Sequence, residues 1–245
     1  MPLRFEAVDD LLGTSHPDTE AYRVYLSLRR DIRSGLVEPC QRLRTEWLKS
    51  TYKASTSPLR EALARLNAEH YVTAEGKRGF RVTDLDHNEY LSLIDLRHDV
   101  ESSALRKSID ARTEDWEGRV LLAHHSLTKA RIENLSDLDK VENREDRHRR
   151  FHLELLSGCN SSWLLRICDQ LSSHAERYRR VLLRGTTIAP SYFDAVDGEH
   201  RDLFDYAMDG DADSAVDLLV KHRERSTIAV LNALEQPKKS VKLVS

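Results

Sequence analysis

Helical spacing of apolar residues dominates this chain, and one short segment departs from it. Residues 20–34 carry a stripe on one helix face, just before Gly35, formed by Tyr22, Tyr25, Leu28 and Ile32. Thr45 can cap a short helix that runs to about Tyr52. Ser57 is a good cap for the next helix, and Pro58 suits its first position. The apolar stripe of that helix is Leu59, Ala62, Leu63 and Leu66.

The departure from helical spacing lies at residues 71–83. Residues 71–73 and 80–83 are rich in strand formers, and the basic glycine-bounded stretch between them suits a hairpin tip. Helices followed by such a hairpin predict a winged helix-turn-helix, which we place in residues 19–84.

From residue 89 to residue 235 the helical pattern continues without a strand signal. We predict helices near residues 87–110, 113–133, 139–158, 161–184, 191–209 and 212–234. The predicted fold class is therefore mainly α, with an N-terminal winged helix-turn-helix and a C-terminal all-helical bundle at 89–235. We expect residues 1–18 to be a disordered tail and residues 236–245 to be frayed.

Composition narrows the class of protein. The chain of 245 residues is 40% hydrophobic and 32% charged, with few glycines and prolines, as in helical globular proteins. It has no run of 18 apolar residues and no signal-peptide pattern near its start, so we expect no membrane span and a cytoplasmic location. The three cysteines form no CxxC pair, which favours reduced thiols.

The charge is unevenly distributed. Residues 41–83 hold nine Lys or Arg against four Glu, a local charge of +5, so the remainder of a chain with net charge −3 carries −8. A basic module on an acidic body suits a protein that binds DNA through one end.

Arg60 is the best candidate for reading DNA bases. It lies near the start of the second helix, opposite the apolar stripe, and arginine can donate to both O6 and N7 of guanine. The alternative is a solvated charge, or a pairing with Glu61 or Glu46. Phosphate contacts are predicted at the helix start, by Ser55, Thr56 and Ser57. Contacts to the DNA backbone or minor groove are predicted at the hairpin tip, by Lys77, Arg78 and Gly79.

Four of the 11 histidines form a second candidate site. His148 and His152 are four residues apart, so both face one side of a helix, while His200 and His222 lie on later helices. Imidazole nitrogens suit zinc, nickel, copper or iron. The spacing alone is weak, because most such pairs are surface or hydrogen-bonded core histidines.

Both halves of the chain resemble one bacterial family. The stretch SPLREALARLNAEHYV with GKRGFRV resembles the winged-helix head of GntR-type transcription regulators. DLRHDVE, RHRRFHLELLSGCN and EHRDLFDYAMDGDADSAVDLLVKH resemble the FCD effector domain of the FadR branch, and DRHRRFH with HAERYRR is most similar to CsiR-type regulators.

The resemblance implies a divalent metal in the helical domain. Family members often hold it through an Asp, a His four residues later and two further histidines. Here His148 takes the position of the Asp, and the other three fall on His152, His200 and His222. A site of four histidines without a carboxylate favours a borderline transition metal, zinc first and nickel second.

The resemblance also implies a small carboxylate effector beside the metal, held by arginine. We assign this contact to Arg97, with Arg177 and Tyr178 as second choices, and a dicarboxylate is one option. The alternative for Arg97 is an i,i+4 ion pair with Glu101. Family members are usually dimers, which implies a homodimer on a palindromic double-stranded operator.

These observations favour a ligand-responsive transcription repressor and not an enzyme. The competing hypothesis is a metal-dependent enzyme that carries a winged helix, but no general base lies at an arguable spacing from the histidines. A third hypothesis, a winged helix used for protein contacts, is disfavoured by the basic head.

Overall fold

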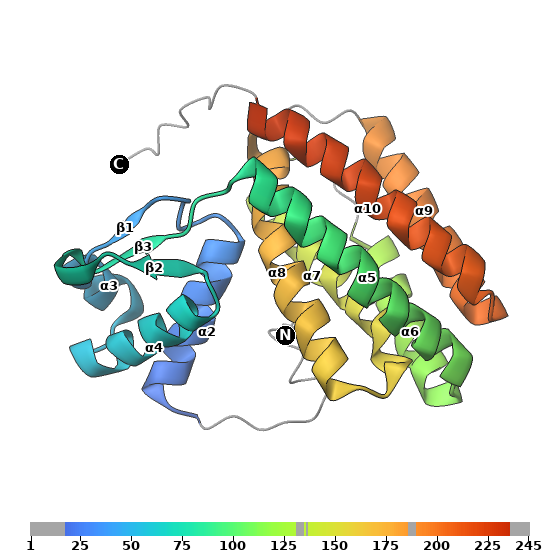
Figure 1. Cartoon of the computed structure of the whole chain (residues 1–245), viewed down its shortest axis with the longest axis horizontal. Helices are drawn as coiled ribbons and strands as arrows, with labels where there is room; N and C mark the ends of the chain where they lie inside the picture. The colour runs from blue at the N-terminus through green and yellow to red at the C-terminus, as the bar shows by residue number, and fades with distance from the viewer. Residues whose placement is uncertain (1–17, 131–134, 136, 186–189, 236–245) are drawn as a thin grey trace.

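The computed structural model describes residues 18–130, 135, 137–185 and 190–235. Of the predicted tails 1–18 and 236–245, all but residue 18 lies outside the described residues. The described part is mainly helical, with one small sheet, as the sequence predicts (Figure 1). None of its helices is long and apolar enough to cross a membrane.

The N-terminal head is a winged helix-turn-helix. Its helices are α2 (Glu20–Arg33), α3 (Thr45–Tyr52) and α4 (Thr56–Ala68). Its antiparallel strands lie in the order β1-β3-β2 and are β1 (Arg42–Leu43), β2 (Val72–Ala74) and β3 (Phe80–Val82). The sequence pattern predicts β2 and β3, whereas the two-residue β1 becomes a strand only by pairing with β3, which lies far along the chain.

Two predicted helix starts need correction. Thr45 is the first residue of α3, whose cap position is Arg44, and α4 begins at Thr56 with Ser55 in the cap position. Neither cap residue makes a side-chain hydrogen bond to the helix. The predicted apolar stripe of α4 is nevertheless buried, and it packs with α2 in the core of the head.

The wing tip is built around glycines. Between β2 and β3 the chain makes a single turn, η1 (Gly76–Arg78). Gly79 has φ of 88°, in the region that favours glycine, and its carbonyl accepts a hydrogen bond of 2.7 Å from the Glu75 N–H. The tip is therefore a compact loop, and it carries the exposed side chain of Arg78.

The C-terminal domain is a bundle of long helices (Figure 1). In chain order they are α5 (His87–Ala111), α6 (Glu114–Thr128), α7 (Leu138–Leu156), α8 (Ser162–Gly185), α9 (Pro190–Asp209) and α10 (Ala212–Glu235), with the short turn η2 (Ser157–Cys159) after α7. Helix 113–133 was predicted too long: α6 ends at Thr128, and residues 131–133 lie outside the described residues. The other predicted helices of this domain agree with the observed ones within two residues at each end. The predicted helix 139–158 includes α7 and most of the turn η2 that follows it directly.

A close approach at Gly158 fixes where α7 lies in the bundle. A Cβ at this position would lie 3.0 Å from Cδ1 of Trp116 and 3.1 Å from Cα of Ser108, so only glycine fits without movement. The buried Trp116 ring fills the space and donates a 2.9 Å hydrogen bond from Nε1 to the Glu154 carbonyl. These contacts hold α7 and its histidines against α5 and α6.

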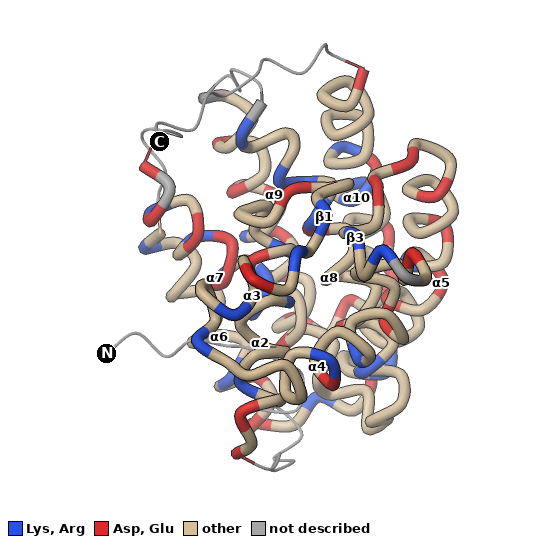
Figure 2. The backbone as a smooth tube through the Cα atoms, turned by 90° about the vertical axis from the view of Figure 1, so that its left-hand side faces the viewer, with Lys and Arg blue, Asp and Glu red and all other residues tan. Residues whose placement is uncertain are grey.

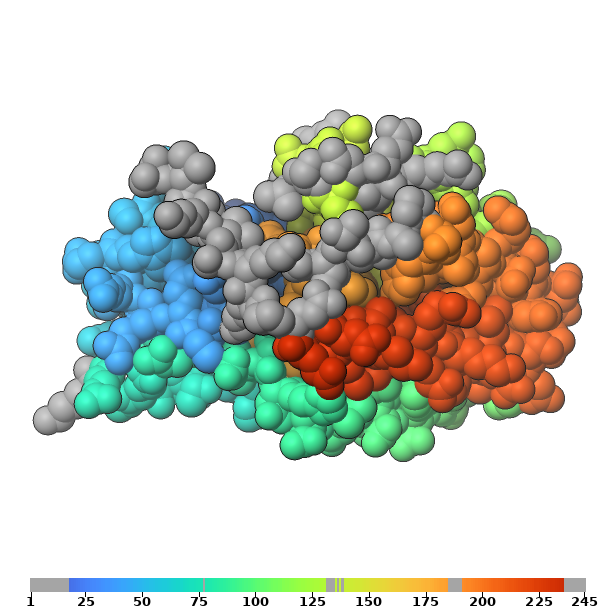
Figure 3. Space-filling model, turned by 90° about the horizontal axis from the view of Figure 1, so that it is seen from above, coloured from blue at the N-terminus to red at the C-terminus, as the bar shows by residue number. Residues whose placement is uncertain are grey.

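The two domains do not share an apolar core. The cluster of the head is drawn from residues 22–82, and the two clusters of the helical domain are drawn from residues 85–234. Figure 3 shows the head, in blue and cyan, as a lobe beside the larger helical domain. The contact between the lobes is therefore made chiefly by polar side chains.

Candidate functional site

The outer face of α4 is free to meet a ligand. Arg60 and Ser57 are exposed and Thr56 is half-buried, while the stripe on the opposite face is buried. Neither acidic residue considered as a partner for Arg60 binds it: Glu61 pairs with Arg65 at 3.2 Å and Glu46 with Lys49 at 3.5 Å.

Basic residues lie on several elements of the head. Figure 2 shows them on α3, α4, β1 and β3. At the wing, Arg81 donates to Glu75 at 2.6 Å and to the Cys40 carbonyl at 2.7 Å, and this bonding lowers the pKa of Glu75. Arg78 at the tip is exposed, whereas the side chain of Lys77 lies outside the described part of the chain. The base of the wing is thus held by ion pairs and its tip projects.

The four predicted histidines come together inside the helical domain. His148 and His152 lie one turn apart on α7, His200 lies on α9 and His222 on α10. All four are buried, and one ring nitrogen of each lies within 4.8 Å of the others. Nε2 of His152 is 3.1 Å from Nε2 of His148 and 3.3 Å from Nε2 of His200.

Carboxylates behind the cluster orient part of it. Nδ1 of His222 lies 2.8 Å from Glu199, which also accepts from Arg225 at 2.6 Å, so Nε2 of His222 is left to face the cluster. Nδ1 of His200 is 3.9 Å from Asp197, beyond hydrogen-bond range. Burial lowers the pKa of every histidine in the cluster, that of His200 to about 3, so all four are neutral near pH 7 and available as metal ligands.

A cavity of about 30 Å³ adjoins the cluster, which is room for about two water molecules. His148 and His222 line it together with Arg144, Glu145, Arg179 and Arg223. Each arginine already has a carboxylate partner. Arg179 donates to Glu145 at 2.8 and 2.6 Å, Arg223 donates to Glu101 at 3.0 Å, and Arg144 donates to Asp197.

The three predicted effector residues lie outside the lining of this cavity. Arg97 forms the alternative ion pair, donating to Glu101 at 2.8 Å, and therefore shares this carboxylate with Arg223. Arg177 donates to the Thr83 carbonyl at 2.6 Å, at the junction with the head. Tyr178 stacks on Tyr90 with ring centroids 4.5 Å apart.

Sequence reasoning missed the arginines that do line the cavity. A usable signal existed for two of them, since Arg144 is four residues before His148 and Arg223 follows His222 directly. Arg179 carried no such signal, because it lies on α8, which contributes no histidine to the cluster.

Comparison with known proteins agrees with this architecture. The description "Bacterial regulatory proteins, gntR family" matches residues 20–82, and "FCD domain" matches residues 92–225. The HTH-type transcriptional repressor GlaR of Escherichia coli (strain K12) is 32% identical over 199 residues, which is 81% of this chain and 90% of GlaR. The chain belongs to the GntR family.

Further relatives support the assignment of this GntR-family chain. The HTH-type regulator BphR of Paraburkholderia xenovorans (strain LB400) is 35% identical over 204 residues, covering 83% of this chain and 82% of BphR. The solved structure of E. coli McbR/YncC matches with a TM-score of 0.75 at 18% identity, over 89% of this chain and 99% of that one. A GntR regulator from Rhodococcus sp. RHA1 gives 0.71 at 21% identity, over 87% and 98%.

Membership in the family establishes the class of activity. The matched families and relatives are DNA-binding transcription regulators and not enzymes, so the protein is a transcription regulator with a GntR head and an FCD domain. The alternative of a metal-dependent enzyme has no support among these relatives.

Proposed function

We propose that this regulator is a repressor whose FCD domain binds a divalent metal through its four histidines and a carboxylate effector in the adjoining cavity. The observation that carries the proposal is the buried histidine cluster opening on a cavity lined by three arginines. Repression is the activity named for the relative GlaR.

The geometry of the histidines supports a tetrahedral metal. An ion with metal–nitrogen bonds of about 2.0–2.1 Å holds neighbouring nitrogens roughly 3.3–3.4 Å apart. Two Nε2···Nε2 distances are already 3.1 and 3.3 Å, and the widest separation in the cluster is 4.8 Å. Small side-chain movements complete the tetrahedron. An all-nitrogen ligand set favours zinc, with nickel second.

The charge balance supports an anionic effector. The cavity arginines are each paired with one carboxylate, so the charge around the cavity is close to neutral before metal binding. A divalent ion bound by four neutral histidines adds two positive charges with no ligand carboxylate to offset them. Arg97 shares Glu101 with Arg223, which adds one further positive charge behind these pairs, and burial together with the Arg97 guanidinium lowers the pKa of Arg223 to about 10. A dicarboxylate matches this excess better than a monocarboxylate.

The contact residues follow from position. Arg179, Arg144 and Arg223 bind the effector carboxylates. Arg97 does not contact the effector but positions Arg223, because both arginines bind Glu101. On the head, Arg60 reads a base, residues 55–57 contact phosphates and the wing tip, residues 77–79, contacts the DNA backbone.

The protein acts as a homodimer in this proposal. Two heads related by a two-fold axis suit a palindromic operator. Trp163 and Ile167, one turn apart on α8, are 77% and 41% exposed, and a second copy packed against this face of α8 would bury their apolar surface. Light scattering of the purified protein measures the mass of the assembly.

A thermal-melt screen tests the proposal. Purified protein is melted with C2 to C6 mono- and dicarboxylates, with added zinc and again with a chelator. The proposal predicts a rise in the melting temperature that is larger for dicarboxylates and is lost on chelation. A rise that survives chelation would assign the anion to the arginines alone, and no rise with any acid would reject the carboxylate.

A further inference from the structure

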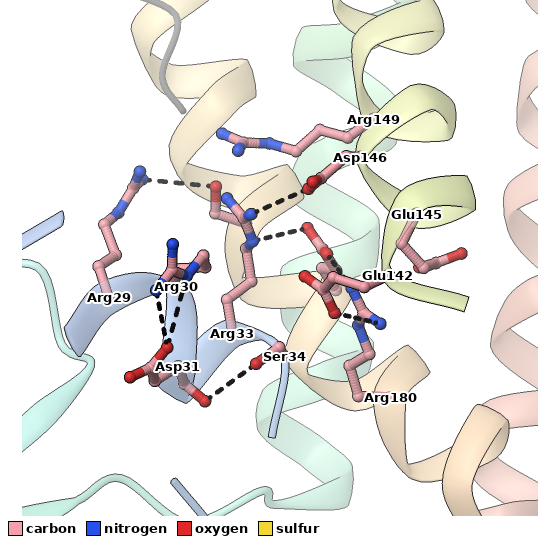
Figure 4. Close-up of polar contacts among 12 residues, drawn as sticks. Arg29, Arg30, Asp31, Arg33, Ser34, Glu142, Glu145, Asp146, Arg149 and Arg180 are labelled. Carbon is pink, nitrogen blue, oxygen red and sulfur yellow. Dashed lines mark hydrogen bonds and ion pairs between the residues drawn. The ribbon is translucent and has the colours of Figure 1, made fainter. Parts of the chain in front are cut away.

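The head and the FCD domain are joined by a buried ion-pair network. Arg33 of α2 is 3% exposed and contacts two helices of the FCD domain at once. Its Nε lies 3.2 Å from Glu176 of α8, and its Nη2 lies 3.4 Å from Asp146 of α7. Figure 4 shows the Arg33 side chain pointing from α2 toward Asp146. Arg33 therefore spans the gap between α7 and α8.

The network continues across the same two helices. Arg180 of α8 binds Glu176 at 3.0 Å and Glu142 of α7 at 3.0 Å. We call Arg33, Glu142, Asp146, Glu176 and Arg180 the latch. Burial acts to raise the pKa of Glu176, but the guanidinium groups of Arg33 and Arg180 outweigh it and hold that pKa below its ordinary value. Glu176 is thus ionised at neutral pH, whereas burial raises the pKa of Glu142 and that of Asp146 above their ordinary values.

The cavity and the latch lie on adjacent faces of α7 and α8. On α7, Glu145 and His148 line the cavity while Glu142 and Asp146 belong to the latch. On α8, Arg179 lines the cavity while Arg180 belongs to the latch. The pairs Glu145–Arg179 and Glu142–Arg180 are therefore two parallel bridges between the same helices, less than one turn apart. A change in the spacing of α7 and α8 at one bridge must also change the distance between the partners of the other.

The latch is suited to opening. Three buried atoms of the latch make no hydrogen bond within the described structure: Nε of Arg33, Oε2 of Glu176 and Nε of Arg180. The first two lie 3.2 Å apart as an ion pair. Buried ion pairs that lack full hydrogen bonding contribute little net stability, and a polar junction allows two domains to move relative to each other. No apolar cluster of the described chain includes residues of both domains, although Tyr71 of the head cluster stacks on His174 of α8 with ring centroids 4.5 Å apart.

We propose that Arg33 senses the separation of α7 and α8, and that an anion bound at Arg179 frees the head by opening the latch. This inference rests on the proposed function, because it takes the cavity as the effector site. A cavity of about 30 Å³ is too small for a carboxylate-bearing metabolite, so binding has to widen it. The ligand displaces Glu145 from Arg179, α7 and α8 separate, and Arg33 can no longer contact both. The head then leaves the orientation that matches the operator.

The test measures how firmly the head is held, using no effector. Nitroxide labels are placed on exposed Ser50 of the head and exposed Asp110 of α5, in the full chain with Cys40→Ser, while the buried Cys159 and Cys168 are left. Dilution with unlabelled chain removes distances between protomers. We expect Arg179→Gln, which removes only the cavity-side bridge, to widen the distance distribution at least about twofold. Arg33→Gln should give a distance distribution of the same width. The double variant, with Arg33→Gln and Arg179→Gln together, should give a distribution no wider than that of either single variant.

Controls separate this inference from the proposed function. Arg106→Gln removes an exposed bridge of 2.7 Å between α5 and Asp213 of α10, far from the latch, and keeps the native width. Glu145→Gln serves if Arg179→Gln does not fold. A native width in both cavity-side variants, with zinc titration still showing one ion per chain, overturns the latch and leaves the metal site standing. Broadening in a protein that binds no zinc supports the latch and rejects the metal.

Discussion

Replacing His152 by leucine should abolish stabilisation by zinc while leaving the fold intact. His152 is the centre of the cluster, since its Nε2 lies 3.1 Å from that of His148 and 3.3 Å from that of His200. Leucine has a similar volume and fills the buried position without offering a ligand. His124→Leu is the matched control: the rings of His124 and His152 both lie 5.4 Å from Phe151, but His124 is outside the cluster.

The expected magnitude follows from linkage. Zinc at 100 times its dissociation constant stabilises the native protein by about 2.7 kcal/mol. For a domain of this size about 1 kcal/mol moves the melting temperature by roughly 2–4 °C, so the wild-type protein should gain about 5–11 °C. Loss of one ligand of four weakens affinity by at least about 100-fold, which leaves roughly 0.4 kcal/mol at the same zinc concentration, or about 1 °C.

Calorimetry with and without chelator measures this difference. Because the head and the FCD domain have separate apolar cores, the shift is read on the transition of the FCD domain. Taking the difference within each variant removes any change in metal-free stability. The reasoning fails if His152→Leu keeps the full zinc-dependent shift, or if His124→Leu loses it.

Three further predictions follow from single side chains. Arg60→Ala should weaken binding to the specific operator more than tenfold, as loss of a two-pronged base contact costs about 1–3 kcal/mol, and equal affinity in fluorescence anisotropy would remove Arg60 from base reading. Gly158→Ala should destabilise the FCD domain by about 1–3 kcal/mol in urea unfolding, because its Cβ meets Trp116 and Ser108 at 3.0 and 3.1 Å; an unchanged midpoint would mean that these contacts relax freely. Burial lowers the pKa of His174 to about 4, so the unfolded chain takes up its proton first as pH falls below 6.5; stability is complete above that pH and decreases by up to about 3 kcal/mol toward pH 4. His174→Phe, which keeps the stack on Tyr71, should flatten this decrease, and parallel urea titrations of the two proteins would show whether it does.

The local parts of the fold could be predicted from the sequence. Helix α5 was predicted at 87–110 and runs from His87 to Ala111, and Asp211 precedes α10 and accepts a 3.0 Å bond from the Ser214 N–H. Helices depend on hydrogen bonds four residues apart and on caps three residues away, so their signals lie within a short window. The same locality paired His148 with His152. Spacing gave only a weak indication that His200 and His222 join them, and the family resemblance supplied the stronger one.

Tertiary packing decided which charged side chains meet. Arg179, Arg180 and Arg177 are neighbours in sequence, yet they face the cavity, the latch and the head, respectively. Successive residues of a helix are rotated by about 100°, so these three side chains point in different directions. The packing register of α8 against α7 and α2 decides which direction faces the cavity, the latch or the head. No local pattern encodes that register, because it depends on the combined shape of residues far apart in the chain. The sequence by itself therefore determined the helices, the winged head and the family, whereas the arginine-lined cavity and its link to the head exist only once the helices are packed.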